Sequence, residues 1–449
     1  MSSAKIYDLV IIGSGPGGHV AALYASRHKL SVCVIEKELT GGTCLNKGCI
    51  PTKALLQSAS ILSKIKNSKE FGIEVNDFKV DFSAVVSRKD IIVSRLRAGI
   101  EALLKANHID LIKGAARLKA GGAVTVNGQD INARSIIIAV GSRPFGLPGI
   151  KMDEIDICSS DGVLNFKELP GSIAIVGGGV IGCEFASLFN SLGSKVFIVE
   201  LMDRILPTQS REVSKKMELL LKKRGVDIYT STKLGSVVKD GGVKLELAGG
   251  QTIAAQKALI SVGRSPNTGE LGLEETGVGL EKGKILVDKG LRTSVKNIYA
   301  IGDCVSGPLL AHKASYDGIV AVDNILGVPR EADYSNIPNC VWTDPEVASV
   351  GLTEEEAKAK YPDARSVKFS YLASGKAAVI GKTEGFIKLI GDTSGKILGI
   401  EIFGEEACDL IGEGVLARDK GVSIKDLGRV VHGHPTLSEI YQGAAEAWC

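Results

Sequence analysis

The sequence predicts an α/β protein built around two copies of one strand–helix–strand unit. In each copy an apolar strand leads through a glycine-rich turn into an amphipathic helix, and a second strand then ends in a glutamate. The first copy extends from Ile6 to Glu36 and the second from Ile173 to Glu200. The glycines and glutamates of the second copy lie 164 positions after their counterparts, since 177 minus 13 and 200 minus 36 both equal 164. A strand that turns sharply into a helix and then continues to another strand is typical of a parallel sheet covered by helices.

The glycine spacing in both copies is that of a turn that holds a pyrophosphate. The first glycine lets the strand turn, the second lets the backbone approach the phosphates, and the third lets the helix pack closely on the strand. Free N–H groups at the helix N-terminus then face the anion. A carboxylate at the end of the second strand accepts hydrogen bonds from a ribose and repels a 2′-phosphate, so Glu200 favours NAD over NADP. The sequence therefore predicts two Rossmann-like dinucleotide-binding domains, marked by Gly13, Gly15, Gly18 and Glu36 and by Gly177, Gly179, Gly182 and Glu200.

Length, charge and cysteine content exclude several classes of protein. The 449 residues correspond to about three domains. The net charge of +3 is spread without a basic block, which argues against binding to nucleic acid or to a membrane surface. Nine cysteines without a signal peptide fit a reducing compartment, so we expect the cytosol, or an organellar matrix after processing. We expect no metal site, because no C-x-x-C pair occurs and His432 and His434 lack further ligands nearby in the sequence.

Residues 41–53, with the sequence G-G-T-C-L-N-K-G-C-I-P-T-K, are the most informative segment of the chain. On a regular helix Cys44 and Cys49 would lie about 7.5 Å apart along the axis and on different faces, whereas a disulfide needs Cα atoms within about 7 Å. Gly48 permits a bend between them, and Pro51 removes a helical N–H just afterwards. Beside a nucleotide fingerprint, this pair predicts a disulfide that is made and broken during catalysis; two unrelated thiols or a fixed structural bridge are the alternatives. Two dinucleotides and a redox pair predict an electron relay with one bound flavin and one exchangeable nicotinamide nucleotide.

Together these motifs resemble the flavin- and pyridine-nucleotide-dependent disulfide oxidoreductases over essentially the whole chain. The resemblance also includes T-S-V-K-N-I-Y-A-I-G-D at 293–303 and H-G-H-P-T-L-S-E at 432–439. It implies a tightly bound, non-covalent FAD, an exchanging NAD⁺/NADH and a C-terminal α+β dimerisation domain. The domains expected from the repeat and the resemblance are an FAD-binding domain with the redox cysteines (1–147), an NAD-binding domain (148–270), a return to the FAD domain (271–335) and a dimerisation domain (336–449).

The resemblance implies further cofactor contacts outside the fingerprints. Asp303 would hydrogen-bond the ribityl chain of the flavin, and Lys53 would lie near the flavin with Glu184 as its partner. A buried ammonium group there would stabilise negative charge on the reduced ring, and the carboxylate would keep the lysine charged. The other expected FAD contacts are Ala116, Gly141, Ala311 and His312, and the other expected NAD contacts are Ile181, Glu184 and Gly263.

The resemblance also implies separate catalytic roles. Cys44 would exchange with a substrate thiol, and Cys49 would pass electrons to the flavin. A base is required, because the thiolate is the nucleophile and an ordinary thiol has a pKa of about 8.5. His434 matches the base of the family, and Glu439 would orient its imidazole. His434 would act in the site of a second subunit, so that a homodimer is required for activity.

The substrate implied by the resemblance is a dihydrolipoyl group, oxidised by NAD⁺ to give lipoamide and NADH. Its carrier would be the lipoyl-bearing protein of a 2-oxoacid dehydrogenase complex or of a glycine cleavage system. A glutathione-type reductase that uses NADPH would replace the negative region around Glu200 with basic residues; Arg204 is nearby, but Glu200 remains. A mercuric- or thioredoxin-type reductase would add a second cysteine pair at the C-terminus, where the sequence has Cys449 alone. A non-catalytic NADH-binding or redox-sensing protein would not need the cysteines, His434 and Glu439 together.

Overall fold

The structure is a computed structural model that describes residues 5–119 and 123–448. The chain divides into two compact units, and it returns to the first unit after building part of the second. The first unit holds Met1–Ala54, Val86–Phe145 and Gly263–Tyr334, and the second holds Leu55–Val85, Gly146–Val262 and Ser335–Cys449. The predicted domain limits at 147, 270 and 335 stay predictions.

The first unit is built on a seven-stranded sheet with the order β3-β2-β1-β6-β5-β4, in which β19 also pairs with β6. Strands β3, β2, β1, β6 and β19 run parallel, whereas β4 and β5 pair antiparallel beside β6. The strands are β1 (Ile6–Ile12), β2 (Val32–Glu36), β3 (Asp110–Lys113), β4 (Ala116–Leu118), β5 (Val124–Val126), β6 (Gln129–Ile138) and β19 (Ile298–Ala300). Two small antiparallel pairs complete the unit, β7 (Ser142–Pro144) with β16 (Arg264–Pro266) and β17 (Leu280–Glu281) with β18 (Lys284–Ile285).

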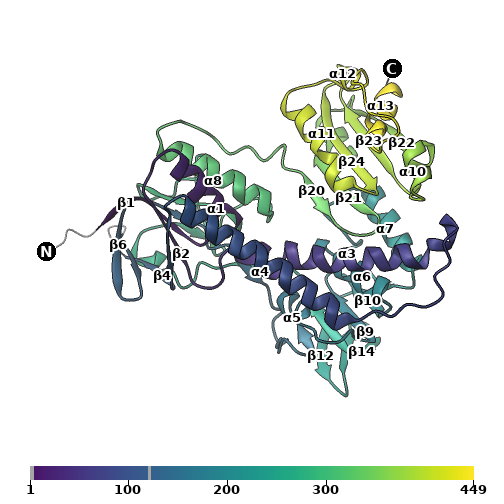
Figure 1. The fold of residues 1–449 in the computed structure, drawn as a ribbon, viewed down its shortest axis with the longest axis horizontal. Coiled ribbons are helices and arrows are strands. Elements are labelled where there is room, and N and C mark those ends of the chain that lie inside the picture. Colours follow the sequence, from purple (N-terminus) through teal and green to yellow (C-terminus); the bar gives the residue numbers. More distant parts are fainter. Residues whose placement is uncertain (1–4, 120–122, 449) are drawn as a thin grey trace. The chain divides into compact units, whose positions relative to one another are not determined.

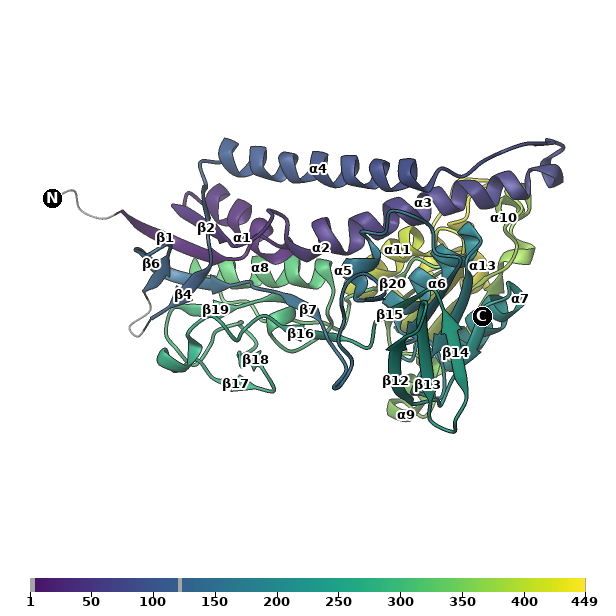
Figure 2. The same cartoon turned by 90° about the horizontal axis from the view of Figure 1, so that it is seen from below.

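Helices cover one face of this sheet. Helices α1 (Pro16–Arg27) and α8 (Ala311–Ile325) lie side by side, and the C-terminal turn of α4 (Phe82–Ala106) joins the same apolar layer (Figures 1 and 2). Leu9 and Ile11 of β1 belong to that layer, whereas Val10 and Ile12 face the core on the opposite side. Burial on both faces explains the uninterrupted apolar run of this strand. Between β2 and α4 lie α2 (Gly42–Lys47) and α3 (Cys49–Lys66), and α3 continues into the second unit.

The second unit repeats the plan of the first in a five-stranded parallel sheet with the order β11-β10-β9-β15-β8. The strands are β8 (Ile157–Cys158), β9 (Ser172–Val176), β10 (Lys195–Val199), β11 (Asp227–Tyr229) and β15 (Lys257–Ile260). The helices are α5 (Ser160–Val163), α6 (Val180–Leu192) and α7 (Arg211–Lys223). An antiparallel sheet of β12 (Leu234–Lys239), β13 (Val243–Leu247) and β14 (Thr252–Ala255) precedes β15.

The C-terminal part of the second unit is an antiparallel sheet with the order β20-β21-β24-β23-β22. The strands are β20 (Asn339–Val341), β21 (Glu346–Gly351), β22 (Arg365–Ser370), β23 (Phe386–Gly391) and β24 (Ile397–Gly404). The helices are α9 (Glu354–Lys360), α10 (Gly375–Val379), α11 (Ala407–Asp419), α12 (Ile424–Leu427) and α13 (Glu439–Glu446). Ile400 and Ile402 of β24 pack with Ile440 and Tyr441 of α13 in one buried cluster. The predicted α/β fold with a C-terminal α+β domain is confirmed.

A buried lysine joins α7 to the antiparallel sheet. The Lys388 side chain of β23 is 4% exposed, and its Nζ lies 2.8 Å from Glu212 of α7, 3.0 Å from Glu354 of α9 and 3.5 Å from Glu401 of β24. Burial alone would raise the pKa of Glu354, but hydrogen bonds from Lys358 and Lys388 lower it to about 2. Ionised Glu354 therefore stabilises the contact between these elements.

We expect the free energy of unfolding of the Glu354→Gln variant to depend less on pH in the acid range than that of the unchanged chain. The folded-state pKa of Glu354 is about 2 and its ordinary value is 4.5, so its stabilising effect is complete above about pH 5 and is lost as the pH falls toward 2. The variant should lose about 2 kcal/mol at pH 7, and the difference from the unchanged chain should shrink toward pH 3. Chemical denaturation at several pH values measures this, with the exposed neighbour Glu355→Gln as the control. A difference that does not vary with pH would contradict the role of the Glu354 charge.

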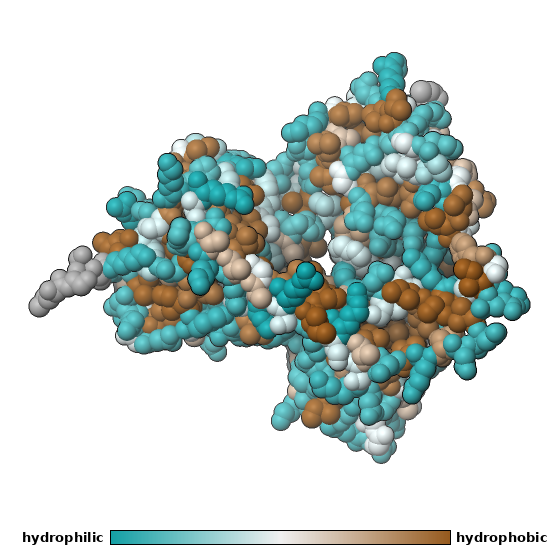
Figure 3. Space-filling model, viewed as in Figure 1, coloured by the Kyte–Doolittle hydropathy of each residue, from teal (hydrophilic) through white to brown (hydrophobic). Residues whose placement is uncertain are grey.

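No helix within the described ranges is long and apolar enough to cross a membrane. On the face drawn in Figure 3, apolar side chains are interspersed with hydrophilic ones.

Candidate active site

The glutamate that ends the first repeat is tied to the glycine-rich turn. Glu36 is buried, and its Oε2 accepts hydrogen bonds from the N–H of Ser14 at 2.9 Å and from the Ser14 hydroxyl at 2.6 Å. Its Oε1 accepts from the N–H of Glu38 at 2.8 Å. The Ser14 hydroxyl in turn accepts from the N–H of Gly41 at 3.1 Å, so this network extends to the start of the cysteine segment.

The same arrangement recurs in the second repeat. Glu200 is as buried as its counterpart, and it accepts hydrogen bonds from the N–H groups of Gly178 at 2.6 Å and Met202 at 2.7 Å. These donors also lie 164 positions after those of the first repeat, since 178 minus 14 and 202 minus 38 both equal 164. The repeat seen in the sequence therefore holds at the level of individual hydrogen bonds.

The first and third glycines of each turn have no room for a side chain. Gly13 and Gly177 both have φ of +104°, a conformation that side chains disfavour. A Cβ atom on Gly18 would lie 1.9 Å from the carbonyl oxygen of Gly13, and one on Gly182 would lie 1.9 Å from that of Gly177. Both helices therefore pack directly on the turns that precede them, as the motif predicts.

The second glycine of each turn lies beside open space at a helix N-terminus. A Cβ atom on Gly179 would meet nothing within 4 Å, and one on Gly15 would meet only Gly42 Cα at 4.0 Å. Neither α1 nor α6 has a side-chain cap, so the first backbone N–H groups of each helix keep their capacity to bind an anion. With a buried carboxylate beside each turn, these residues fit a dinucleotide at both sites.

The helix breaks between the two predicted redox cysteines. Helix α2 ends before Gly48, whose φ of −147° and ψ of −109° are not helical, and α3 begins at Cys49. This break lets the thiols of Cys44 and Cys49 form a hydrogen bond with each other. That hydrogen bond and burial raise the pKa of Cys44.

The cysteine segment packs directly on the first glycine-rich turn. Gly42, the first residue of α2, has φ of +62°, and a Cβ atom there would lie 2.6 Å from Gly15 Cα. Cys44 lies in the first turn of the same helix. The redox pair is therefore adjacent to the first dinucleotide site.

Asp303 lies in a network that includes the residues directly after two predicted cofactor contacts, Gly141 and Gly263. Its Oδ2 accepts a hydrogen bond from the Ser142 hydroxyl at 2.5 Å, and that hydroxyl accepts from Arg264 Nε at 2.7 Å. Ser142 directly follows Gly141, and Arg264 directly follows Gly263. The structure thus brings three separate sequence segments together around the Asp303 carboxylate.

A fully buried ion pair fixes the backbone just before Asp303. Lys313 Nζ lies 2.8 Å from Asp317 Oδ2, and both side chains have no exposed surface. Asp317 also accepts hydrogen bonds from the Gly302 N–H at 3.0 Å and from the Tyr334 hydroxyl at 3.0 Å. Because Gly302 precedes Asp303, this ion pair holds the aspartate in position.

The C-terminal histidines have different environments. His434 Nδ1 lies 2.9 Å from Glu439 Oε1, and the other oxygen of Glu439 accepts from the Thr436 N–H at 2.8 Å. The hydrogen bond with His434 lowers the pKa of Glu439. The His434 side chain is 79% exposed, whereas that of His432 is 5% exposed and pairs with Glu413 at 2.8 Å. His434 is therefore the histidine oriented by a carboxylate and accessible to an incoming thiol.

The remaining predicted cofactor residues are divided between the two units. Lys53 of α3 and Glu184 of α6 belong to different units, so their pairing stays a prediction. Glu184 is buried, and its Oε1 accepts a hydrogen bond from the Trp342 N–H at 3.1 Å. The other predicted contacts lie at the starts of helices and strands. Ala311 and His312 are the first two residues of α8, Ala116 is the first residue of β4, and Ile181 is the second residue of α6.

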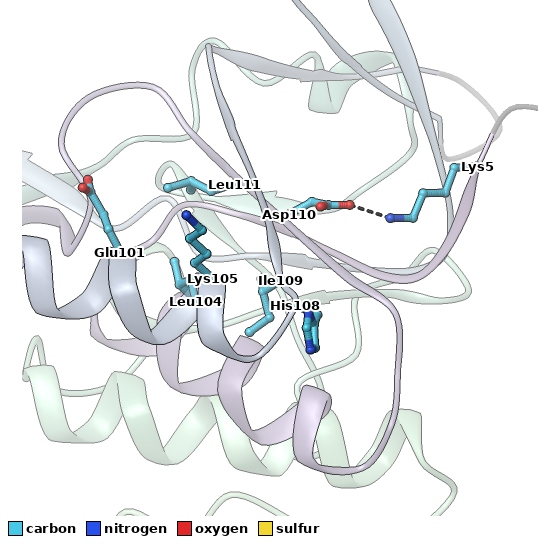
Figure 4. Close-up of a pocket in the computed structure, with 8 residues that line it drawn as sticks. All are labelled: Lys5, Glu101, Leu104, Lys105, His108, Ile109, Asp110 and Leu111. Atoms are coloured by element: carbon cyan, nitrogen blue, oxygen red, sulfur yellow. Dashed lines mark hydrogen bonds and ion pairs between the residues drawn. The ribbon is translucent and has the colours of Figure 1, made fainter.

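A surface hollow of about 570 Å³ lies beside β3 and the end of α4 (Figure 4). Lys5 and Asp110 form an ion pair of 2.6 Å on one side of it. Its lining residues are Lys5, Glu101, Leu104, Lys105, His108, Ile109, Asp110 and Leu111. None of them is a predicted catalytic or cofactor residue, so this hollow is separate from the candidate site.

Two family models match the chain. The model described as pyridine nucleotide-disulphide oxidoreductase matches residues 7–318, and the model of the dimerisation domain of that family matches residues 337–445. The chain belongs to the pyridine nucleotide-disulphide oxidoreductases. Family membership confirms the predicted enzyme class and the predicted use of FAD and NAD(H). It also confirms that this oxidoreductase carries a C-terminal dimerisation domain.

Known proteins resemble this oxidoreductase over nearly its full length. It is 42% identical to a dihydrolipoyl dehydrogenase of Bacillus subtilis over 99% of this chain and 98% of that protein. It is 41% identical to a dihydrolipoyl dehydrogenase of Geobacillus stearothermophilus over 98% of this chain and 95% of that protein. The crystal structure of LpdA from Mycobacterium tuberculosis has a TM-score of 0.93 at 26% identity and covers 98% of this chain and 99% of that one. RclA of Escherichia coli, a HOCl-induced flavoprotein disulfide reductase, has a TM-score of 0.89 at 30% identity, with 98% and 99% coverage.

Sequence reasoning missed four residues that support Asp303 in this oxidoreductase. Ser142 and Arg264 directly follow Gly141 and Gly263, which are expected cofactor contacts. This position next to a predicted contact was the signal that could have identified them. Lys313 and Asp317 lie four apart, as an ion pair on one helix face requires, but the same spacing also occurs in exposed pairs. Their complete burial distinguishes this pair, and the sequence does not show burial.

Proposed function

We propose that this chain catalyses the FAD-dependent oxidation of dihydrolipoyl groups by NAD⁺, which gives lipoyl disulfide and NADH. The observation that carries the proposal is the hydrogen-bonded pair of Cys44 and Cys49, packed on the first dinucleotide turn. The full-length similarity to proteins named dihydrolipoyl dehydrogenase supports the choice of substrate.

The cysteine pair exchanges its disulfide with the substrate. A substrate thiolate attacks Cys44 Sγ, the bond between the two cysteines breaks, and Cys49 leaves as a thiolate. The second substrate thiol, after losing its proton, attacks the substrate sulfur bound to Cys44, so the substrate leaves as a cyclic disulfide. Two electrons from the substrate then reside on the cysteine pair.

The fingerprints of the chain would hold the two cofactors. The turn of Gly13, Gly15 and Gly18 with Glu36 would bind FAD, which when bound supplies two-electron acceptance from the cysteines and hydride delivery to NAD⁺. The second turn with Glu200 would bind NAD⁺. Asp303 would hydrogen-bond the FAD ribityl chain. Ser142 and the buried Lys313–Asp317 pair would keep the Asp303 carboxylate oriented.

His434 of the partner subunit would remove the proton from the substrate thiol. Its hydrogen bond to Glu439 fixes the ring and stabilises the imidazolium that forms. The dimerisation domain supports a homodimer. The physiological partner would be the lipoyl-bearing protein of a 2-oxoacid dehydrogenase complex or of a glycine cleavage system, in the cytosol.

Anaerobic turnover of dihydrolipoamide by the FAD-loaded protein tests this function. We expect rapid formation of NADH with NAD⁺, and much slower turnover with NADP⁺. The parallel assay offers glutathione disulfide with NADPH. Turnover of glutathione disulfide with no oxidation of dihydrolipoamide would overturn the substrate while leaving the electron relay. No turnover of either would favour a redox sensor.

The two equivalent glutamates offer matched variants for the cofactor assignment. We expect Glu200→Gln to raise KM for NAD⁺ by about 10-fold to 100-fold, since a hydrogen bond to a charged group is worth about 1.5–3 kcal/mol. Its preference for NAD⁺ over NADP⁺ should fall, because the charge that repels a 2′-phosphate is lost. Glu36→Gln should instead weaken FAD retention and leave the NAD⁺/NADP⁺ preference unchanged. Steady-state kinetics and the ratio of flavin to protein measure both effects, and an altered preference in Glu36→Gln would contradict the assignment of the two sites.

A further inference from the structure

A second pair of cysteines lies in the C-terminal antiparallel sheet. Cys340 is the middle residue of β20, and Cys408 is the second residue of α11. Their thiols form a hydrogen bond with each other, although the two residues are far apart in the sequence. Cys408 Sγ also lies 3.8 Å from the carbonyl oxygen of Val341, the residue that follows Cys340.

The surrounding backbone holds both cysteines in place. Strand β20 pairs antiparallel with β21, so that Cys340 lies opposite Ala348, and α11 packs on these strands. The Cys408 N–H donates to Glu346 Oε2 of β21 at 2.9 Å, and this bond fixes the N-terminus of α11 on the same sheet. These contacts hold the backbones of the two cysteines next to each other.

The other buried thiols of the described chain have different neighbours. Cys33, Cys158, Cys183 and Cys304 are fully buried, and burial is the main cause of their raised pKa. The charges that act on them come from carboxylates and lysines, not from a second cysteine. The pKa of Cys408 is raised as well, but its largest cause is the hydrogen bond with Cys340, ahead of burial, as the hydrogen bond with Cys49 is for Cys44.

We propose that Cys340 and Cys408 are a second oxidisable thiol pair, separate from the catalytic one, which closes into a disulfide when a hydroperoxide is the oxidant. One thiolate attacks the peroxide, the O–O bond breaks, and a sulfenic acid and one molecule of water or alcohol form. The other sulfur then attacks the sulfenic sulfur, the S–O bond breaks, and water leaves. The two sulfurs lose two electrons, and the peroxide gains them. A dithiol reductant reverses the reaction by exchange.

The site is suited to a small oxidant. Cys408 is half-buried and lies beside the exposed residues Glu406 and Asp409, whereas Cys340 is buried behind it. Glu346 is close enough to accept the proton that the Cys408 thiol must lose. Burial raises the pKa of Glu346 to about 7, so its carboxyl group can accept or release a proton at neutral pH. The site therefore contains two adjacent sulfurs and a proton acceptor.

Peptide mapping of the FAD-loaded, full-length protein tests the proposal. The protein is treated with hydrogen peroxide, its free thiols are alkylated, and it is digested with trypsin without reduction. Residues 331–358 and 397–418 are tryptic peptides that each hold one of the two cysteines. We expect a disulfide-linked pair of these peptides that increases with peroxide and disappears with dithiothreitol. Cys408→Ala should abolish the linked pair, and Cys158→Ala, which removes another buried thiol, should retain it.

The wild-type result alone can overturn the proposal, so no conclusion depends on a variant that folds poorly. Absence of the linked peptides at peroxide concentrations that fully oxidise Cys44 and Cys49 would overturn it. Linkage of Cys340 or Cys408 to any other cysteine, including Cys449, which lies outside the described residues, would also overturn it. Persistence of the linkage in the presence of dithiothreitol in the native protein would show a fixed structural bridge instead of a reversible pair.

Discussion

Replacing Cys44 with serine is expected to abolish the oxidation of dihydrolipoamide while the FAD stays bound. Cys44 Sγ is the atom that the substrate attacks in the proposed exchange, and a serine hydroxyl cannot form a disulfide with Cys49. The loss of turnover should be of the order of 10⁴-fold or more, as for other nucleophile replacements. FAD retention should not change, because the first glycine-rich turn and Glu36 remain intact. The rate of NADH formation and the visible absorbance of the bound flavin measure the two effects.

The matched control is Cys158→Ser, which removes a buried thiol from β8 without touching the redox pair. It should keep its turnover. In Cys44→Ser, anaerobic NADH should still bleach the flavin absorbance, because electron transfer from nicotinamide to flavin does not pass through Cys44. Turnover retained by Cys44→Ser would contradict the proposed chemistry. Loss of the flavin from the variant would mean that Cys44 supports the fold of the site instead.

The features that could be predicted from the sequence are those that depend on residues close together in the chain. The glycine turns at 13–18 and 177–182 are local, and their repetition at a constant offset fixed the expectation of two similar domains. The break between Cys44 and Cys49 could also be foreseen, because Gly48 lies between residues that a regular helix would separate. The pairing of His434 with Glu439 was expected from the family resemblance of residues 432–439, and the hydrogen bond between them spans only five positions.

The features that could not be predicted depend on residues that are distant in the sequence. Ser142, Arg264 and Asp303 meet around one carboxylate, yet 161 positions separate the first from the last. Gly42 packs on Gly15 so closely that a Cβ atom on Gly42 would lie 2.6 Å from Gly15 Cα, and composition does not reveal this approach. The hydrogen-bonded pair of Cys340 and Cys408 was missed for the same reason. In the alternative reductase classes a second cysteine pair was expected at the C-terminus, whereas here the sheet brings together two cysteines from within the domain.

Replacing His434 with glutamine is expected to slow dihydrolipoamide oxidation by about 10²-fold to 10⁴-fold, the usual effect of losing a general base. The substrate thiol has an ordinary pKa of about 8.5, so its thiolate forms without assistance in alkaline solution. Turnover of the variant should therefore rise steeply between about pH 7 and pH 9 relative to the unchanged enzyme. This partial rescue distinguishes a base from a residue that only supports the fold. Steady-state kinetics across that pH range, with circular dichroism to verify folding, provide the measurement.

His432→Gln is the matched control for His434→Gln, because the two histidines are two positions apart but differ in environment. His432 is buried against Glu413, so its replacement should lower thermal stability without producing the alkaline rescue. Glu439→Gln keeps the length of the side chain but removes its charge, so it should reduce turnover less than His434→Gln and weaken the orientation of the imidazole. If His432→Gln showed the alkaline rescue and His434→Gln did not, the base would be His432. The exposed imidazole of His434 would then serve the dimer contact and not the chemistry.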